Sequence, residues 1–209
     1  MGHSENDFFL NTDVFSDRLL DWEIPNTWWS RRYEYPWAIK YAGEKFVAAD
    51  LGCGWHFRPF KDALAKLCKH VYAVDNNERV LDLSARYKFA ANMTVLVADI
   101  EKETQILSAS IDRAFSISVI EELGDQKAAL TEMRRMLRPE GLAILTFDVT
   151  FNKDLPQGRY KGIAVDKILE LAASAGLIPR SPVNKTQANR ICNKSLNLCV
   201  YHLVLKGAV

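Results

Sequence analysis

The sequence lacks the features that mark membrane, secreted and nucleic-acid-binding proteins. No apolar run approaches the roughly eighteen residues of a membrane span, and residues 1–9 lack a basic start followed by an apolar core. The 27 basic and 26 acidic residues nearly cancel, so there is no excess positive charge for binding nucleic acid. We therefore expect a soluble, cytoplasmic protein with no membrane or nucleic acid partner.

Cysteine is scarce and scattered. Cys53, Cys68, Cys192 and Cys199 show no C-x-x-C spacing, so we expect no metal site and predict reduced thiols. A chain of 209 residues with 48% hydrophobic composition is long enough for one well-buried domain and short for two. We divide it into an N-terminal helical and aromatic segment, residues 1–45, and a main domain, residues 46–209.

A strand, a glycine turn and a helix are predicted in succession from residue 46. Residues 46–60 read FVAADLGCGWHFRPF, and the apolar start is typical of a strand buried on both faces of a parallel sheet. Gly52 and Gly54 leave the backbone open to close approach by a ligand. Residues 60–69 have helical apolar spacing, and the first turn of such a helix can present N–H groups to an anion. The stretch predicts a nucleotide-like ligand.

The glycine spacing separates two kinds of nucleotide-binding protein. A dinucleotide fingerprint has a third glycine three positions after the second, where this chain has Phe57. The sequence D-L-G-C-G, which begins at Asp50, instead resembles the first motif of class I S-adenosylmethionine-dependent methyltransferases. The resemblance implies that Asp50 holds the ammonium group of the cofactor, and that the backbone of Gly52, Cys53 and Gly54 lies under its methionine portion.

An acid also ends the second predicted strand, residues 70–75. Asp75 lies about twenty residues beyond the glycine turn, where an acid can accept both ribose hydroxyls of an adenosine. The alternative is a helix N-cap for residues 77–89, although Asn76 is also available as the cap. We assign Asp75 and Asn76 to the cofactor site.

A third strand, residues 93–98, is followed by Asp99 and Ile100. An acid after a strand is by itself only a common loop residue. The family resemblance implies that Asp99 bonds the adenine amino group and that Ile100 lies against the ring.

The fourth predicted strand, residues 111–119, leads to Glu121 and Glu122. In open α/β sheets the ligand lies outside the carboxyl ends of the strands, where the strand order reverses, so these acids should come near the reacting methyl group. Glu121 is our candidate general base, although both acids also suit a helix start. We assign Ser118 to the cofactor, and we add His56, which stands where the family usually has another glycine, to the catalytic set.

Residues 26–41 gather six aromatic side chains around two arginines. Such a segment can simply brace the sheet. In small methyltransferases of the family it often folds over the cofactor, which would make Arg31, Arg32 and Tyr35 candidates for the cofactor carboxylate, because a guanidinium matches a carboxylate bidentately. We assign Arg32 to this role.

The remaining segments complete an alternating pattern. We predict a short helix within residues 13–22 and, later, a helix over 125–137, a turn at 138–141, a strand over 142–149, a helix over 165–175 that stops at Gly176, and strands over 177–183 and 196–205. Alternating strands and helices predict an α/β fold with a doubly wound, mostly parallel sheet and helices on both faces. The resemblance implies seven strands with an antiparallel last strand.

The function implied by the resemblance is methyl transfer from S-adenosylmethionine to an oxygen or nitrogen nucleophile of a small-molecule or sugar acceptor. S-Adenosylhomocysteine would be the product. Two alternatives stay open. One is a non-catalytic S-adenosylmethionine-binding or S-adenosylhomocysteine-binding protein, because fold does not fix function. The other is a dinucleotide-dependent oxidoreductase, which Phe57 disfavours.

Overall fold

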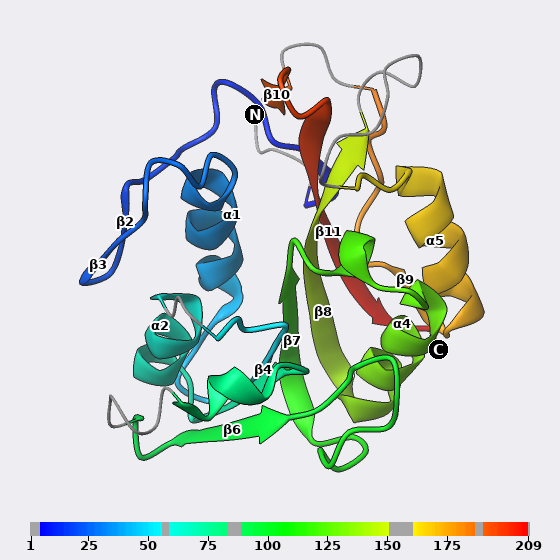
Figure 1. The fold of residues 1–209 in the computed structure, drawn as a ribbon. Coiled ribbons are helices and arrows are strands. Elements are labelled where there is room, and N and C mark those ends of the chain that lie inside the picture. Colours follow the sequence, from blue (N-terminus) through cyan, green and yellow to red (C-terminus); the bar gives the residue numbers. More distant parts are fainter. Residues whose placement is uncertain (1–4, 56–58, 83–88, 151–160, 187–189, 209) are drawn as a thin grey trace.

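A mostly parallel sheet forms the centre of the protein (Figure 1). The structure is a computed structural model that describes residues 5–55, 59–82, 89–150, 161–186 and 190–208. The strands follow the order β1-β11-β8-β7-β4-β5-β6. The parallel strands are β4 (Val47–Leu51), β5 (His70–Asp75), β6 (Met93–Val97), β7 (Ile111–Ile117) and β8 (Leu137–Thr150). β11 (Leu198–Gly207) runs antiparallel to β8, as predicted for the last strand.

Three short strands pair in succession along the other edge of β11. They are β9 (Leu177–Pro179), β1 (Asp7–Phe8) and β10 (Cys192–Asn193), all antiparallel to it. The pairing of β1 joins the N-terminal segment to the main sheet. The division of the chain at residue 45 stays a prediction.

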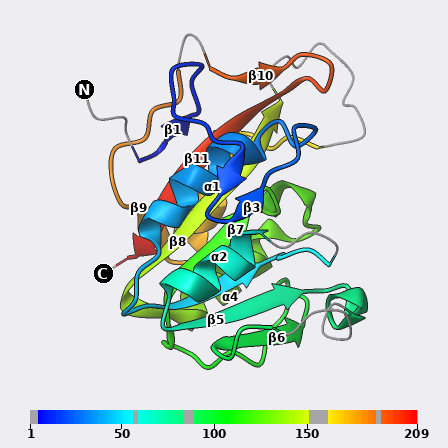
Figure 2. The same cartoon turned by 90° about the vertical axis from the view of Figure 1, so that its left-hand side faces the viewer.

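Helices cover both faces of the sheet, as the alternating pattern predicted (Figure 2). α1 (Arg31–Ala38), η1 (Ile39–Tyr41) and α2 (Pro59–Leu67) pack on one face, with Tyr35, Ala38, Phe60 and Leu64 in its core. α4 (Gln126–Met136) and α5 (Val165–Ser174) pack on the other. Burial of these apolar side chains, worth about 1.5 to 3 kcal/mol for each large one, holds the layers together. The order β4-turn-α2 places the glycine turn at the carboxyl edge of the sheet.

Several predicted elements differ in the structure. Residues 13–22 contain no helix; β2 (Arg18–Leu19) and β3 (Trp22–Glu23) form a hairpin instead, with Leu20 at φ 52°. The turn predicted at 138–141 lies inside β8, where the register with β7 shifts. The strands predicted over 177–183 and 196–205 run over Leu177–Pro179 and Leu198–Gly207 instead. Of the helix predicted over 77–89, the structure describes η2 (Glu78–Val80), and residues 83–88 lie outside the described part. These differences leave the order of the main strands unchanged.

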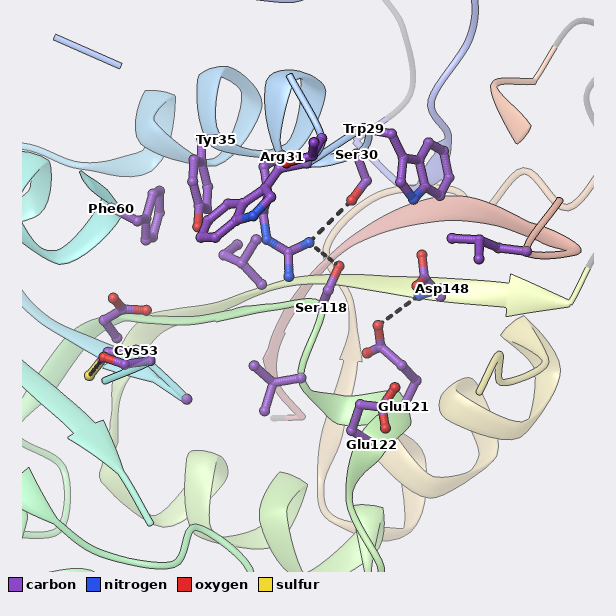
Figure 3. Close-up of a pocket in the computed structure, with 18 residues that line it drawn as sticks. Trp29, Ser30, Arg31, Tyr35, Cys53, Phe60, Ser118, Glu121, Glu122 and Asp148 are labelled. Carbon is purple, nitrogen blue, oxygen red and sulfur yellow. Dashed lines mark hydrogen bonds between the residues drawn. The ribbon is translucent and has the colours of Figure 1, made fainter. Parts of the chain in front are cut away.

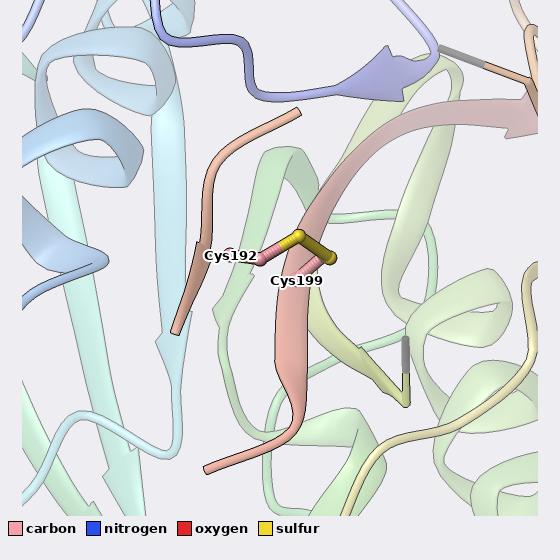
Figure 4. The surroundings of a disulfide bond; sticks show 2 residues. All are labelled: Cys192 and Cys199. Atoms are coloured by element: carbon pink, nitrogen blue, oxygen red, sulfur yellow. A yellow bond between two sulfur atoms is a disulfide. The ribbon is translucent and has the colours of Figure 1, made fainter. Parts of the chain in front are cut away.

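The prediction that all thiols are reduced was wrong for two of the four cysteines. Cys192 and Cys199 form a disulfide (Figure 4). They are direct partners in the antiparallel pair β10–β11, with Cα atoms 4.2 Å apart, and facing residues of neighbouring strands come close enough for such a bond. The absence of C-x-x-C spacing does not exclude a cross-strand pair of cysteines.

No helix in the described residues combines the length and apolarity that crossing a lipid bilayer requires.

Candidate functional site

A cavity of about 540 Å³ opens at the carboxyl ends of β4, β7 and β8 (Figure 3). α1 and the residues before it form its opposite wall. Its lining consists of Thr27, Trp28, Trp29, Ser30, Arg31, Tyr35, Asp50, Gly52, Cys53, Gly54, Phe60, Ile117, Ser118, Val119, Glu121, Glu122, Asp148 and Leu196. The cavity therefore joins the glycine turn to the acids after the fourth parallel strand in the chain, two features that the sequence placed at one site.

The backbone conformation of the turn at residues 52–54 requires glycine at two positions. Gly52 and Gly54 have φ values of 78° and 72°, a region that residues with a Cβ rarely adopt. A Cβ on Gly52 would lie 2.5 Å from Cγ2 of Val119. The turn is tied to β5, since the Gly52 and Cys53 N–H groups donate to the Val74 carbonyl at 2.8 and 3.0 Å. The turn thus provides a fixed backbone surface on the cavity wall.

We expect Gly52→Ala to destabilise the protein and to weaken cofactor binding. The left-handed backbone costs about 1 to 2 kcal/mol, and the contact with Val119 adds overpacking of about 1 to 3 kcal/mol. Gly176→Ala is the matched control, because Gly176 has φ 75° but its Cβ would come no closer than 3.9 Å to another residue. Urea denaturation and titration with S-adenosylhomocysteine measure both effects. If both variants lost the same stability and both bound S-adenosylhomocysteine with wild-type affinity, the close contact between residue 52 and Val119 would have no role.

Asp50 is a buried carboxylate at the floor of the cavity. It is 4% exposed, and burial raises its pKa to about 7, although the Lys61 ammonium group counteracts the shift. Lys61 is fully buried in α2, and its Nζ donates to the carbonyls of Cys53 and Gly54 at 3.2 Å each. No sequence pattern selected Lys61, because a lysine within a helix forms no motif. The Lys61 ammonium group stabilises the glycine turn through these two hydrogen bonds. It also places a fixed positive charge near the carboxylate of Asp50.

Arg31 is the arginine that reaches into the cavity (Figure 3). Its Nη1 donates to Glu34 Oε2 at 2.5 Å and to Ser118 Oγ at 2.7 Å. Burial lowers the pKa of Arg31, but the charges of Glu34, Tyr35 and Glu121 and the hydrogen bond to Glu34 together outweigh burial, and the net shift is upward. Glu34 is fully buried and also accepts from Ser118 Oγ and Thr146 Oγ1, at 2.6 and 2.5 Å. This network connects α1 with β7 and β8.

Ser118 lines the cavity in a strained conformation. Its φ is 47°, although it is not glycine, and such residues persist only where the surroundings hold them. Its N–H donates to the Thr146 carbonyl at 2.9 Å, and its hydroxyl lies between Arg31 and Glu34. The structure therefore places Ser118 in the cavity lining, and its assignment to the cofactor stays a prediction.

Arg32, which we assigned to the cofactor carboxylate, does not line the cavity. Its guanidinium pairs with Asp17 and stacks on Phe15, 4.9 Å from the ring centroid. Successive residues of a helix point about 100° apart, so Arg31 and Arg32 face different surroundings. The geometry brings Arg31 rather than Arg32 to the glycine turn.

The residues predicted to hold adenosine lie outside the cavity lining. Asp75 accepts from the N–H groups of Gly54 and Asn77, at 2.8 and 3.0 Å. Asn76 is exposed, and Asn77 rather than Asn76 caps η2. The Asp75 carboxylate therefore ties the glycine turn to the end of β5.

Asp99 and Ile100 have different surroundings. Asp99 accepts from the Glu101 N–H and pairs with Lys102, contacts that lower its pKa. Ile100 is buried in the core. Both lie at the end of β6, so their assignment to adenine stays a prediction.

Of the two predicted catalytic residues, Glu121 is in the cavity and His56 lies outside the described residues. Glu121 is 4% exposed, and its Oε1 accepts from the Asp148 N–H at 3.1 Å. Burial and the nearby Asp148 carboxylate raise the pKa of Glu121. Asp148 was missed as a site residue, although it too is an acid near the end of a parallel strand, the pattern that selected Asp50, Asp75 and Asp99.

Comparison with known proteins finds similarity to methyltransferases. Residues 49–145 match the family described as "Methyltransferase domain". A "Probable S-adenosylmethionine-dependent methyltransferase" of Mycobacterium tuberculosis is 28% identical over 170 residues, which cover 77% of this chain and 59% of the relative. The alignment thus spans about three fifths of the relative's length.

Solved structures share the fold. One named as the [4+2]-cyclase SpnF has a TM-score of 0.71 at 11% identity and covers 99% of this chain and 88% of its own. Another is a Burkholderia thailandensis 1,6-didemethyltoxoflavin-N1-methyltransferase, solved with 1,6-didemethyltoxoflavin and S-adenosylhomocysteine. It has a TM-score of 0.62 at 17% identity, and the match covers 88% of this chain and 82% of that protein.

The fold is Rossmann-like, and the cavity lies at the switch point between β4 and β7. The family match over residues 49–145 and the similarity to the mycobacterial relative support the predicted membership of the class I S-adenosylmethionine-dependent methyltransferase family. The names of these relatives support the prediction of S-adenosylmethionine as the cofactor.

Proposed function

We propose that the protein transfers a methyl group from S-adenosylmethionine to an oxygen or nitrogen nucleophile of a small-molecule or sugar acceptor. The observation that carries the proposal is the single cavity that runs from the glycine turn, past Arg31, to the acids Glu121 and Asp148. In Figure 3, Cys53 lies on one side of Arg31, and Glu121 and Asp148 lie on the other. The cavity thus offers two adjoining subsites, as a two-substrate reaction requires.

The residues of the glycine-turn side fit the cofactor. The Asp50 carboxylate makes no hydrogen bond to the part of the chain that the structure describes, so it can accept from an ammonium group. Gly52 and Gly54 allow the close approach of a ligand. When bound, S-adenosylmethionine supplies an activated methyl group on a sulfonium sulfur. Asp75, Asp99 and Ile100 stay our assignments for the adenosine portion.

Arg31 is our revised assignment for the cofactor carboxylate. It is the basic residue among the described residues that line the cavity, and Glu34 and Ser118 fix its position. A guanidinium held in place binds a carboxylate with little further loss of side-chain entropy.

We expect Arg31→Ala to weaken binding of S-adenosylhomocysteine by about 10-fold to 150-fold, the loss of one charge-assisted hydrogen bond worth about 1.5 to 3 kcal/mol. Arg32→Ala is the matched control and should bind as the wild type does, because Arg32 faces Asp17 and Phe15. Since Arg31→Ala leaves Glu34 buried without its cation, the double variant Arg31→Ala with Glu34→Gln should be titrated as well. If Arg31→Ala and Arg32→Ala bound S-adenosylhomocysteine equally well, Arg31 would have no role in cofactor binding, and α1 would serve only to pack against the sheet.

A second candidate function is a protein that binds the cofactor but transfers no methyl group. The similarity to the [4+2]-cyclase favours this second function, because a protein with the same fold is named for a reaction other than methyl transfer. Incubation with S-adenosylmethionine and a panel of small amines and alcohols separates the two functions. We expect S-adenosylhomocysteine to form above the acceptor-free background with at least one member. Tight binding of S-adenosylhomocysteine without its formation would favour the non-catalytic function.

A further inference from the structure

Two carboxylates at one end of the cavity carry buried oxygen atoms without a hydrogen bond from any described residue. They are Oε2 of Glu121 and Oδ1 of Asp148. Glu121 is 4% exposed, and its other oxygen accepts the Asp148 N–H at 3.1 Å. Both residues line the cavity, and Figure 3 shows their side chains close together beyond Arg31. Buried polar atoms are rarely left unpaired, so this pair of oxygens suggests a ligand that donates hydrogen bonds.

The surroundings of this pair are predominantly acidic. η3 (Ile120–Glu122) adds Glu122 to the lining, and α1 adds Arg31 and, behind it, Glu34. Nη1 of Arg31 donates to Ser30 Oγ, Glu34 Oε2 and Ser118 Oγ, and the positive charge of Arg31 offsets only part of the upward pKa shift of Asp148. Burial and the charge of Glu34 raise the pKa of Asp148 to about 7. An anionic acceptor would be repelled here, whereas a cation would relieve the crowding of negative charge.

We propose that this end of the cavity, formed by Glu121, Glu122 and Asp148, binds the methyl acceptor as a protonated amine. The inference rests on the proposed function and narrows its acceptor to nitrogen. An ammonium group carries several N–H donors and can satisfy both unpaired oxygens, whereas a hydroxyl has one donor and a carboxylate has none. Trp28 and Trp29 line the same cavity, and indole faces attract cations.

The carboxylate pair also provides the proton acceptor that an amine needs before it can react. One N–H bond of the ammonium breaks, and an O–H bond forms on Glu121 or Asp148. The nitrogen keeps the bonding electron pair as a free lone pair, and the carboxylate later loses the proton to solvent. A base whose pKa lies near neutrality is suited to both steps, and the Asp148 pKa of about 7 meets this condition. The residues therefore bind the acceptor and make it nucleophilic.

Three probes with the same ring test the inference: 2-phenylethylamine, 2-phenylethanol and phenylacetate. Each is titrated by calorimetry into the full chain saturated with S-adenosylhomocysteine. We expect the amine to bind at least tenfold more tightly than the alcohol, and phenylacetate to bind more weakly still. Glu121→Gln and Asp148→Asn should each lower the affinity for the amine at least tenfold, with the affinity for the alcohol and for S-adenosylhomocysteine changed less than twofold. Glu140→Gln, which removes an exposed acid of β8, should change none of them.

Three results would overturn the inference: equal or tighter binding of the alcohol or phenylacetate, an amine affinity that neither substitution lowers, or no binding of the amine at millimolar concentration. All three presuppose that S-adenosylhomocysteine binds. If S-adenosylhomocysteine itself does not bind, the proposed function fails instead, and the two failures are therefore distinguishable.

Discussion

Glu34→Gln should destabilise the folded protein by about 3 to 5 kcal/mol, the usual effect of leaving one partner of a buried ion pair without the other. The amide keeps the shape of the side chain but removes the charge that faces Arg31 at 2.5 Å. Glu34 is fully buried and also holds the hydroxyls of Ser118 and Thr146. Urea denaturation measures the loss.

Two further variants make this result specific. Glu44→Gln removes an exposed acid and should change the free energy of unfolding by less than about 0.5 kcal/mol. Arg31→Met combined with Glu34→Gln should cost less than Glu34→Gln alone, because no buried charge is then left unpaired. A loss below about 1 kcal/mol for Glu34→Gln would show that the network does not hold α1 to the sheet.

Asp50→Asn should have opposite effects on stability and on cofactor binding. Burial raises the Asp50 pKa from 3.8 to about 7 in the folded protein, so the native state binds more protons than the unfolded state between these pH values. Stability of the wild type should therefore fall as pH rises through this window. The substitution removes this cost but leaves the buried Lys61 ammonium group without the Asp50 charge, so we expect a reduced gain of about 2 kcal/mol at pH 8 that shrinks toward pH 4.

The same substitution should weaken S-adenosylhomocysteine binding by about 10-fold to 150-fold, because the carboxylate that accepts from the ammonium group is lost. Denaturation at pH 5 and pH 8, together with calorimetry, measures both effects. Asp82→Asn, at an exposed position, serves as the control. A variant that is no more stable at pH 8 than at pH 5 relative to wild type, or that binds the ligand normally, would contradict the role of Asp50.

The sheet was predictable because its strands are apolar runs bounded by turn residues and acids. β5 and the first residues of β6 and β7 were predicted to the residue, and α5 ends before Gly176 as predicted. Gly176 has a positive φ of 75°. Hydrophobic periodicity determines such elements locally. The hairpin of β2 and β3 and the cross-strand pair Cys192 and Cys199 depend on contacts that no local pattern encodes.

The ends of the parallel strands predicted part of the cavity lining, but Asp75, Asn76, Asp99 and Ile100 lie outside it. The lining residues that a helix contributes could not be selected from the sequence. Asp50, the glycine turn, Ser118 and Glu121 line one cavity because the carboxyl ends of parallel strands meet. The choice between Arg31 and Arg32 depended on the rotation of α1 about its axis, which two adjacent arginines do not reveal. Lys61 and Glu34 are buried charges whose roles come from tertiary contacts with the glycine turn and Ser118.

Titration calorimetry of the full chain with S-adenosylhomocysteine and, separately, with NAD tests the central claim most directly. We expect one S-adenosylhomocysteine per chain with a Kd in the micromolar range, and at 100 times that Kd a stabilisation of about 2.7 kcal/mol. NAD should give no binding heat, since Phe57 stands where a dinucleotide site has its third glycine. Binding of NAD in place of S-adenosylhomocysteine would contradict the assignment of the cavity.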